Sequence, residues 1–203
     1  MDQAAEHWES VYGSRALDEL SWFQASPAVS LRLLQQAAPQ TGSVIDVGAG
    51  ASTLADLLVE AGWADVTVLD VSASALSAVR ARLGPRADRV SFVAADLLSW
   101  QPRRSYDVWH DRAVFHFLVA PADQARYVAL AGRAVATGGA LVLGSFAADG
   151  PTRCSGLPIT RYDPETLADA FAPAFRLEHA EREEHVTPGG SIQPFSWVVL
   201  RRR

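Results

Sequence analysis

The fold of this 203-residue chain is decided by residues 43–53, which read Ser-Val-Ile-Asp-Val-Gly-Ala-Gly-Ala-Ser-Thr. The apolar run predicts a buried strand, the glycines predict a tight turn, and the residues after them predict the start of a helix. A second apolar run at residues 66–69 ends in Asp70. A strand, a glycine turn and an acid that closes the next strand together indicate a nucleoside-binding site.

The details of the turn favour one class of nucleoside ligand. Glycine at positions 48 and 50 lets the backbone approach a ligand closely, and the Asp70 carboxylate can accept both hydroxyls of a ribose. A dinucleotide site usually has a third glycine where Thr53 stands here, and Asp46 would repel a pyrophosphate. S-adenosylmethionine carries a sulfonium and an ammonium and no phosphate, so the charge of Asp46 favours this cofactor over NAD.

From Val44 to Ser145 the chain resembles the class I S-adenosylmethionine-dependent methyltransferases. The resemblance is carried, in motif order, by Asp46-Val47-Gly48-Ala49-Gly50, Asp70, Ala95-Asp96-Leu97, Tyr106-Asp107-Val108 and Gly138-Gly139. One position departs from the pattern, because Ser52 replaces the usual third glycine of the loop.

The resemblance implies S-adenosylmethionine as cofactor, S-adenosylhomocysteine as product, and a role for each motif residue. It assigns Gly48 and Gly50 to the methionine part, Asp70 to the ribose and Asp96 to the adenine amino group. The expected cofactor-binding residues are Asp46, Gly48, Gly50, Asp70, Val71, Asp96 and Leu97, with Val71 and Leu97 flanking the adenine ring.

Strands that alternate with helices predict an α/β fold with a doubly wound, Rossmann-like parallel sheet. We expect strands near residues 43–46, 66–69, 90–94, 106–110, 140–145, 175–180 and 196–200, and helices at 53–61, 74–83, 121–136 and 163–171. An earlier helix is expected to begin at Ser26-Pro27, with serine as its cap. The last two strands should form a hairpin. The resemblance implies seven strands in the order 3-2-1-4-5-7-6, with strand 7 antiparallel.

The length predicts a single domain over residues 1–203. Within it, residues 1–40 are expected to form an N-terminal helical or lid segment, and residues 41–203 the core. In related methyltransferases such a segment folds over the cofactor, where aromatic rings can attract a sulfonium. Trp22 and Phe23 are therefore candidates for the substrate side, although rings that staple the first helix to the sheet would explain them equally well.

The densest group of candidate catalytic residues is segment 109–117, where the family places a substrate-facing loop. His110 or Asp111 could orient the acceptor or take its proton. The alternatives are that Asp111 and Arg112 form a local ion pair or helix cap, and that His116 is a core histidine instead of a substrate-side residue.

A second candidate segment is the long loop at residues 149–162, because long connections often carry function. Arg153 and Arg161 could clamp a carboxylate or phosphate of a substrate, with Tyr162 beside them. The alternative is a structured surface loop whose arginines pair with the acidic surface. Cys154 does not stand in the Pro-Cys pair typical of cytosine methylation, so we do not expect a nucleophilic cysteine.

Composition excludes several classes of function. The net charge of −5 argues against a nucleic-acid partner. The sequence has no apolar run long enough to span a membrane and no signal-peptide pattern at its start, and its single cysteine fits a reducing cytoplasm. The histidines and the cysteine lack metal-ligand spacing, so no metal site is expected.

Three kinds of function are compatible with these patterns. The first is a methyltransferase that acts on a small molecule or, as an alternative, on a protein lysine. The second is an NAD(P)-dependent oxidoreductase, and the third is a non-catalytic module that binds the cofactor. The sequence does not determine the acceptor, the acceptor atom or the oligomeric state.

Overall fold

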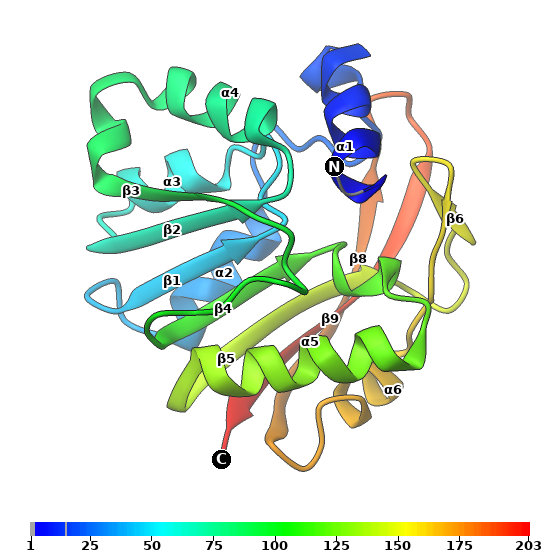
Figure 1. The fold of residues 1–203 in the computed structure, drawn as a ribbon. Coiled ribbons are helices and arrows are strands. Elements are labelled where there is room, and N and C mark those ends of the chain that lie inside the picture. The colour runs from blue at the N-terminus through cyan, green and yellow to red at the C-terminus, as the bar shows by residue number, and fades with distance from the viewer. Residues whose placement is uncertain (1–2, 15) are drawn as a thin grey trace.

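A computed structural model describes residues 3–14 and 16–203 of the chain (Figure 1). The helices are α1 (Gln3–Ser14), α2 (Ala28–Ala37), α3 (Leu54–Glu60), α4 (Ala73–Leu83), α5 (Pro121–Ala134) and α6 (Pro164–Asp169), with short 3-10 turns η1 (Leu17–Glu19), η2 (Gly84–Arg89) and η3 (Phe115–Phe117). The strands are β1 (Ser43–Val47), β2 (Asp65–Asp70), β3 (Val90–Ala94), β4 (Tyr106–Arg112), β5 (Val135–Phe146), β6 (Arg153–Cys154), β7 (Leu157–Pro158), β8 (Phe175–Val186) and β9 (Ile192–Arg202).

Seven of these strands form one sheet in the order β3-β2-β1-β4-β5-β9-β8. Strands β1 to β5 pair in parallel, and β9 runs antiparallel to both β5 and β8. The predicted order 3-2-1-4-5-7-6 and the predicted C-terminal hairpin are confirmed, with β8 as the sixth strand and β9 as the reversed seventh. The carboxyl ends of the parallel strands meet at one edge, which is where such sheets bind ligands.

The alternation of side chains along each strand divides the core into two layers. Val44, Val108 and Val142 pack on one face with residues of α2, α3 and α4. Ile45, Trp109 and Leu141, their neighbours in sequence, pack on the other face with residues of α5 and α6. Both faces of the sheet are covered by helices, as a parallel sheet requires.

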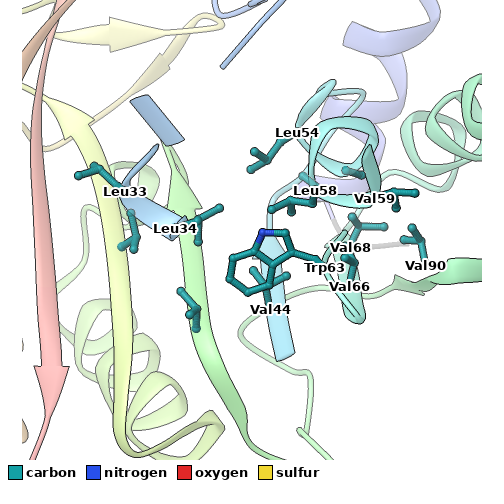
Figure 2. Packing of buried hydrophobic residues seen from close by; sticks show 14 of the residues in the cluster. Leu33, Leu34, Val44, Leu54, Leu58, Val59, Trp63, Val66, Val68 and Val90 are labelled. Atoms are coloured by element: carbon teal, nitrogen blue, oxygen red, sulfur yellow. The ribbon is translucent and has the colours of Figure 1, made fainter. Parts of the chain in front are cut away.

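Trp63 anchors the layer formed by α2 and α3. Its side chain is completely buried, and Figure 2 shows its ring among side chains of α2, α3, β1 and β2. Truncation of a buried tryptophan typically costs about 3–5 kcal/mol. This packing fixes α3, and with it the glycine turn that precedes α3.

Several predicted boundaries were wrong. Helix α2 begins at Ala28 after Pro27, and no side chain caps it, so Ser26 does not have the predicted role. Strand β5 begins at Val135, five residues before the predicted start, because Val135 already pairs with Tyr106 of β4. The segment at residues 149–162 was predicted as a loop and contains the hairpin β6–β7. Among the described residues, no helix has the length and apolar character needed to cross a bilayer.

Candidate cofactor and acceptor site

The turn after β1 can be built only with glycine at two positions. Gly48 and Gly50 have φ angles of +60° and +53°, in the left-handed region that glycine favours. A β-carbon on Gly48 would lie 2.0 Å from Cγ2 of Val114, and one on Gly50 would lie 2.1 Å from the hydroxyl of Tyr12. The close approach predicted from the sequence is therefore made by the protein's own side chains, which pack over the turn.

Asp70 ties this turn to the end of β2. Its Oδ2 accepts a hydrogen bond from the Gly50 backbone N–H at 2.8 Å, and its Oδ1 accepts one from Ser72 at 2.7 Å. Burial raises the pKa of Asp70 to about 6, against the lowering effect of these two bonds. A carboxylate has about four acceptor positions, so Asp70 can still accept the hydroxyls of a ribose.

A cavity of about 490 Å³ opens at the carboxyl ends of the strands. Of the residues predicted to bind the cofactor, five line this cavity: Gly48, Asp70, Val71, Asp96 and Leu97. Asp46 lines a smaller neighbouring cavity of about 60 Å³, which shares Gly48 with the larger one. Gly50 contributes through its bond to Asp70. The structure thus brings the predicted nucleoside-binding residues together.

The lining of the larger cavity also includes an aromatic wall, which we define as Trp8, Tyr12, Trp22 and Phe117. The Trp8 ring lies 6.0 Å from Trp22 and 5.3 Å from Phe117, both in edge-to-face contacts. Helix α1 supplies Trp8 and Tyr12, and it stands over the ends of β1 and β4 (Figure 1). Trp22 lines both cavities and Phe23 lines the smaller one, so the structure places these two predicted substrate-side residues beside the site. A lid role for the N-terminal segment stays a prediction.

His110 lies beneath the site. Its Nδ1 is 2.7 Å from Oδ1 of Asp46, and its Nε2 is 3.0 Å from the Ser30 hydroxyl. The side chain is 2% exposed and, among the described residues, is not part of the lining of either cavity. Both ring nitrogens are engaged by the protein, so the structure favours a positioning role, with His110 holding Asp46 under the glycine turn.

Asp111 is also fully buried, on the opposite face of β4. Its carboxylate accepts hydrogen bonds from the backbone N–H groups of Val114 and Phe115 and from the Tyr127 hydroxyl. Burial raises the pKa of Asp111 to about 6. These bonds shape the turn after β4, so Asp111 too is placed to position the loop, without contacting an acceptor.

Arg112 is a site residue that the sequence suggested only as an ion-pair partner of Asp111. Its Nη1 donates to the Trp22 carbonyl at 3.0 Å, and its guanidinium lies 4.6 Å from the centre of the Phe195 ring. The Nε and Nη2 atoms are buried and have no hydrogen-bond partner among the described residues. Arg112 lines both cavities. Successive side chains of a strand point to opposite faces, so Arg112 and Asp111 cannot form the ion pair considered above. This rule could have placed Arg112 on the face opposite Asp111 from the sequence.

The other predicted substrate-side residues lie outside the two cavities, as far as the structure describes their linings. Arg153 donates to the Gly156 carbonyl and Arg161 to the Gly150 carbonyl, so both stabilise their own loop. Tyr162 packs on Phe115 and accepts a hydrogen bond from Gln124. His116 packs between Phe117 and Phe146, and burial, reinforced by the charge of Arg112, lowers its pKa to about 3. His116 therefore lies in the core, but it is not the satisfied core histidine of the alternative, because both ring nitrogens are buried without a hydrogen-bond partner among the described residues.

Comparison with known proteins agrees with this geometry. Residues 44–139 match the model of a methyltransferase domain family. A trans-aconitate 2-methyltransferase of Rhizobium etli is 43% identical over 75 residues, which make up 36% of this chain and 28% of that protein. The chain thus matches less than a third of the length of this curated relative.

Solved structures share the fold over nearly the whole chain. One, from a study of the conversion of a disulfide bond into a thioacetal group during echinomycin biosynthesis, has a TM-score of 0.79 and 20% identity, and the match covers 98% of this chain and 92% of the other. Another is a Burkholderia thailandensis 1,6-didemethyltoxoflavin-N1-methyltransferase with bound 1,6-didemethyltoxoflavin and S-adenosylhomocysteine. Its TM-score is 0.71 at 20% identity, with 98% and 84% of the two chains covered.

These matches favour a methyltransferase over the oxidoreductase considered above. The site also fits the cofactor of the family, because its buried carboxylates suit a cationic nucleoside without phosphates. Residues 44–139 thus match a methyltransferase domain, and the strand order and the residues at the strand ends agree with those of a class I S-adenosylmethionine-dependent methyltransferase.

Proposed function

We propose that this protein transfers the methyl group of S-adenosylmethionine to a small molecule. The observation that carries the proposal is one cavity of about 490 Å³ that is lined both by expected nucleoside-binding residues and by the aromatic wall. Its size is within the range of about 300–1,000 Å³ that is usual for small-molecule sites. The cofactor supplies an activated methyl group on a sulfonium sulfur.

The residues of the nucleoside-binding end can each hold one part of the cofactor. Asp70 accepts the ribose hydroxyls, and Asp96 accepts the adenine amino group. Val71 and Leu97 cover the faces of the adenine, and both line the cavity. Asp46 and Gly48, which line the smaller cavity, lie on the methionine side.

We assign the aromatic wall to the part of the cavity where the methyl group is transferred. Rings of Trp8, Tyr12 and Trp22 attract a positively charged sulfur and exclude water from it. Methyl transfer needs the acceptor atom about 3–3.5 Å from the methyl carbon. A rigid aromatic wall limits the orientations that the acceptor can take and so favours this approach.

Cys154 and Tyr12, which line the larger cavity, are not suited to act as general bases. Burial raises the pKa of Cys154 to about 11 and raises that of Tyr12 still further above its ordinary value, so both stay protonated at neutral pH. His110 and Asp111 are engaged by other residues. The acceptor therefore brings its own free electron pair, either as an anion or as a neutral amine, which needs no base before it attacks.

Two similarities support a small-molecule acceptor. The Burkholderia enzyme was solved with a small molecule bound, and the Rhizobium enzyme is named for a small organic acid. A protein lysine is the alternative acceptor. The absence of a nucleic-acid partner, the absence of a metal and a cytoplasmic location remain predictions from composition.

The proposal can be tested by supplying labelled cofactor to two fractions of a cell extract, separated by ultrafiltration. S-adenosyl-[methyl-³H]methionine and the protein are incubated with the small-molecule ultrafiltrate or with the retained macromolecules. We expect label in products of the ultrafiltrate, and much less label at subsaturating cofactor when Asp70 is replaced by Asn. Label confined to macromolecules would favour the lysine alternative, and label in neither fraction would contradict the proposal.

A further inference from the structure

Arg112 presents an unsatisfied cationic edge at the site. Its Nε and Nη2 atoms lie on the same edge of the guanidinium, and both are buried without a partner among the described residues. Buried polar atoms are normally hydrogen-bonded, and an unpaired charged donor is costly. An edge of this kind therefore indicates a missing partner.

The geometry of the edge matches a carboxylate, because two parallel N–H donors can meet two oxygens or one. The same chain shows this pairing elsewhere. Arg82 points its Nε and Nη2 at the Asp56 carboxylate, at 2.9 Å and 2.8 Å. In Arg112 the same two atoms are buried without a partner among the described residues, in a side chain that lines both cavities.

The carboxylates nearest to Arg112 do not satisfy it. Glu183 accepts hydrogen bonds from Gln24 at 2.8 Å and from Trp197 at 2.7 Å. Asp46 holds His110. The negative charges of Glu183 and Asp46 favour the charged form of Arg112 through longer-range attraction. Neither carboxylate accepts a hydrogen bond from Nε or Nη2 of Arg112.

Arg112 lines both cavities, so its edge lies beside the methionine side and away from the residues assigned to ribose and adenine. The residues assigned to ribose and adenine follow β2 and β3, whereas the Arg112 guanidinium lies over Phe195 of β9, on the other side of β4. Trp22 and Cys154, its neighbours at this end of the cavity, carry no charge at neutral pH. A bound anion would be the natural partner of the isolated cation.

We propose that the acceptor is a small organic acid with a planar or apolar body, and that its carboxylate binds the Nε–Nη2 edge of Arg112. The aromatic wall holds the body of the acid, and the carboxylate fixes its orientation toward the methyl group. Because both nitrogens are shielded in this structure, a neighbouring side chain shifts as the acid enters. This inference rests on the proposed function.

A matched pair of probes tests the inference by calorimetry on protein saturated with S-adenosylhomocysteine. Benzoate and benzamide have nearly the same shape and differ in charge. We expect benzoate to bind at least tenfold more tightly than benzamide, and Arg112→Gln to abolish the difference. Arg126→Gln is the matched control, because Arg126 also lines the cavity but its guanidinium already pairs with Asp123 and the Leu98 carbonyl. This variant should keep the preference for benzoate.

Equal binding of the two probes, binding of neither, or a preference that survives in Arg112→Gln would overturn the inference. A second measurement excludes a role for Arg112 toward the cofactor's own carboxylate. Arg112→Gln should bind S-adenosylhomocysteine and 5′-methylthioadenosine, which lacks the amino-acid part, within threefold of the parent protein. A tenfold loss for the first compound alone would assign Arg112 to the cofactor. Failure of the parent protein to bind S-adenosylhomocysteine would instead refute the proposed function.

Discussion

At the scale of single residues, the site depends on buried carboxylates whose partners define their roles. Asp70 lies where the sequence predicts, because an acid at the end of the second strand must lie beside the glycine turn of the first. Its bonds to Gly50 and Ser72 add a second role, which is to hold that turn in shape.

Cofactor affinity should depend on pH through Asp70. Ribose hydroxyls donate to the ionised carboxylate, and the pKa of Asp70 is raised to about 6. Affinity for S-adenosylhomocysteine should therefore rise as pH increases from 5 to about 7. Asp70→Asn should remove this pH dependence and weaken binding by about 1.5–3 kcal/mol at neutral pH. Calorimetric titration across this range measures both effects, and an unchanged affinity in the variant would refute the ribose role.

Gly48→Ala should destabilise the turn for two reasons. The residue has positive φ, which costs about 1–2 kcal/mol for alanine, and the new β-carbon would collide with Val114. With an overpacking cost of about 1–3 kcal/mol, the free energy of unfolding should fall by about 2–5 kcal/mol. Gly62→Ala is the control, because Gly62 also has positive φ but nothing lies within 4 Å of its β-carbon position.

Denaturant unfolding should therefore show a larger loss for Gly48→Ala than for Gly62→Ala. The double variant Gly48→Ala, Val114→Ala removes the methyl group that causes the collision and should recover part of the difference. Equal losses in the two single variants would show that packing against Val114 does not matter.

Tyr127→Phe tests the positioning role of Asp111. The hydroxyl of Tyr127 donates to Asp111 and accepts from Trp109 at 2.9 Å, so its loss leaves two buried groups without this partner. The free energy of unfolding should fall by about 1–3 kcal/mol, with S-adenosylhomocysteine affinity within threefold of the parent. Unchanged stability in thermal and denaturant unfolding would contradict the role.

At the scale of elements, helix α1 contacts both the cavity and helix α4. Its Tyr12 and Trp8 line the cavity, and its Glu9 accepts a hydrogen bond from the Ser74 hydroxyl of α4. A ligand in the cavity would add contacts to this helix more than to the sheet.

Hydrogen exchange should therefore report ligand binding at α1. We expect S-adenosylhomocysteine to slow amide exchange in residues 4–14 at least fivefold, by stabilising the closed position of the helix. Amides in the middle of β1 and β4 should change less. A uniform change across the chain, or none in α1, would argue against a lid.

Helices and strands could be predicted from the sequence where a local residue pattern was sufficient to define them. The glycine turn and the apolar strands β1 and β2 could be placed from the sequence alone. The start of β5 could not, because Val135 continues directly from α5 and becomes a strand residue by pairing with Tyr106 of β4. The hairpin β6–β7 is two residues long on each side, and so its pattern is too short to detect.

At the scale of the whole molecule, the order of the sheet was predictable from the resemblance, and the alternation of strands and helices gave its class. The acceptor end was not predictable in the same way. It joins Trp8 of α1, Arg112 of β4 and Cys154 of β6, which are far apart in the sequence, and only the folded chain brings them to one cavity. The arginines of segment 149–162 looked suitable by composition, yet their side chains bind their own loop.

The central claim is that the cavity at the ends of β1 to β3 receives S-adenosylmethionine. Calorimetry with S-adenosylhomocysteine and, separately, with NADH tests it most directly. The fold and the charges of Asp46 and Asp70 predict one molecule of S-adenosylhomocysteine bound per chain and no measurable binding of NADH. Absence of heat with S-adenosylhomocysteine, or NADH binding that S-adenosylhomocysteine does not displace, would contradict the claim.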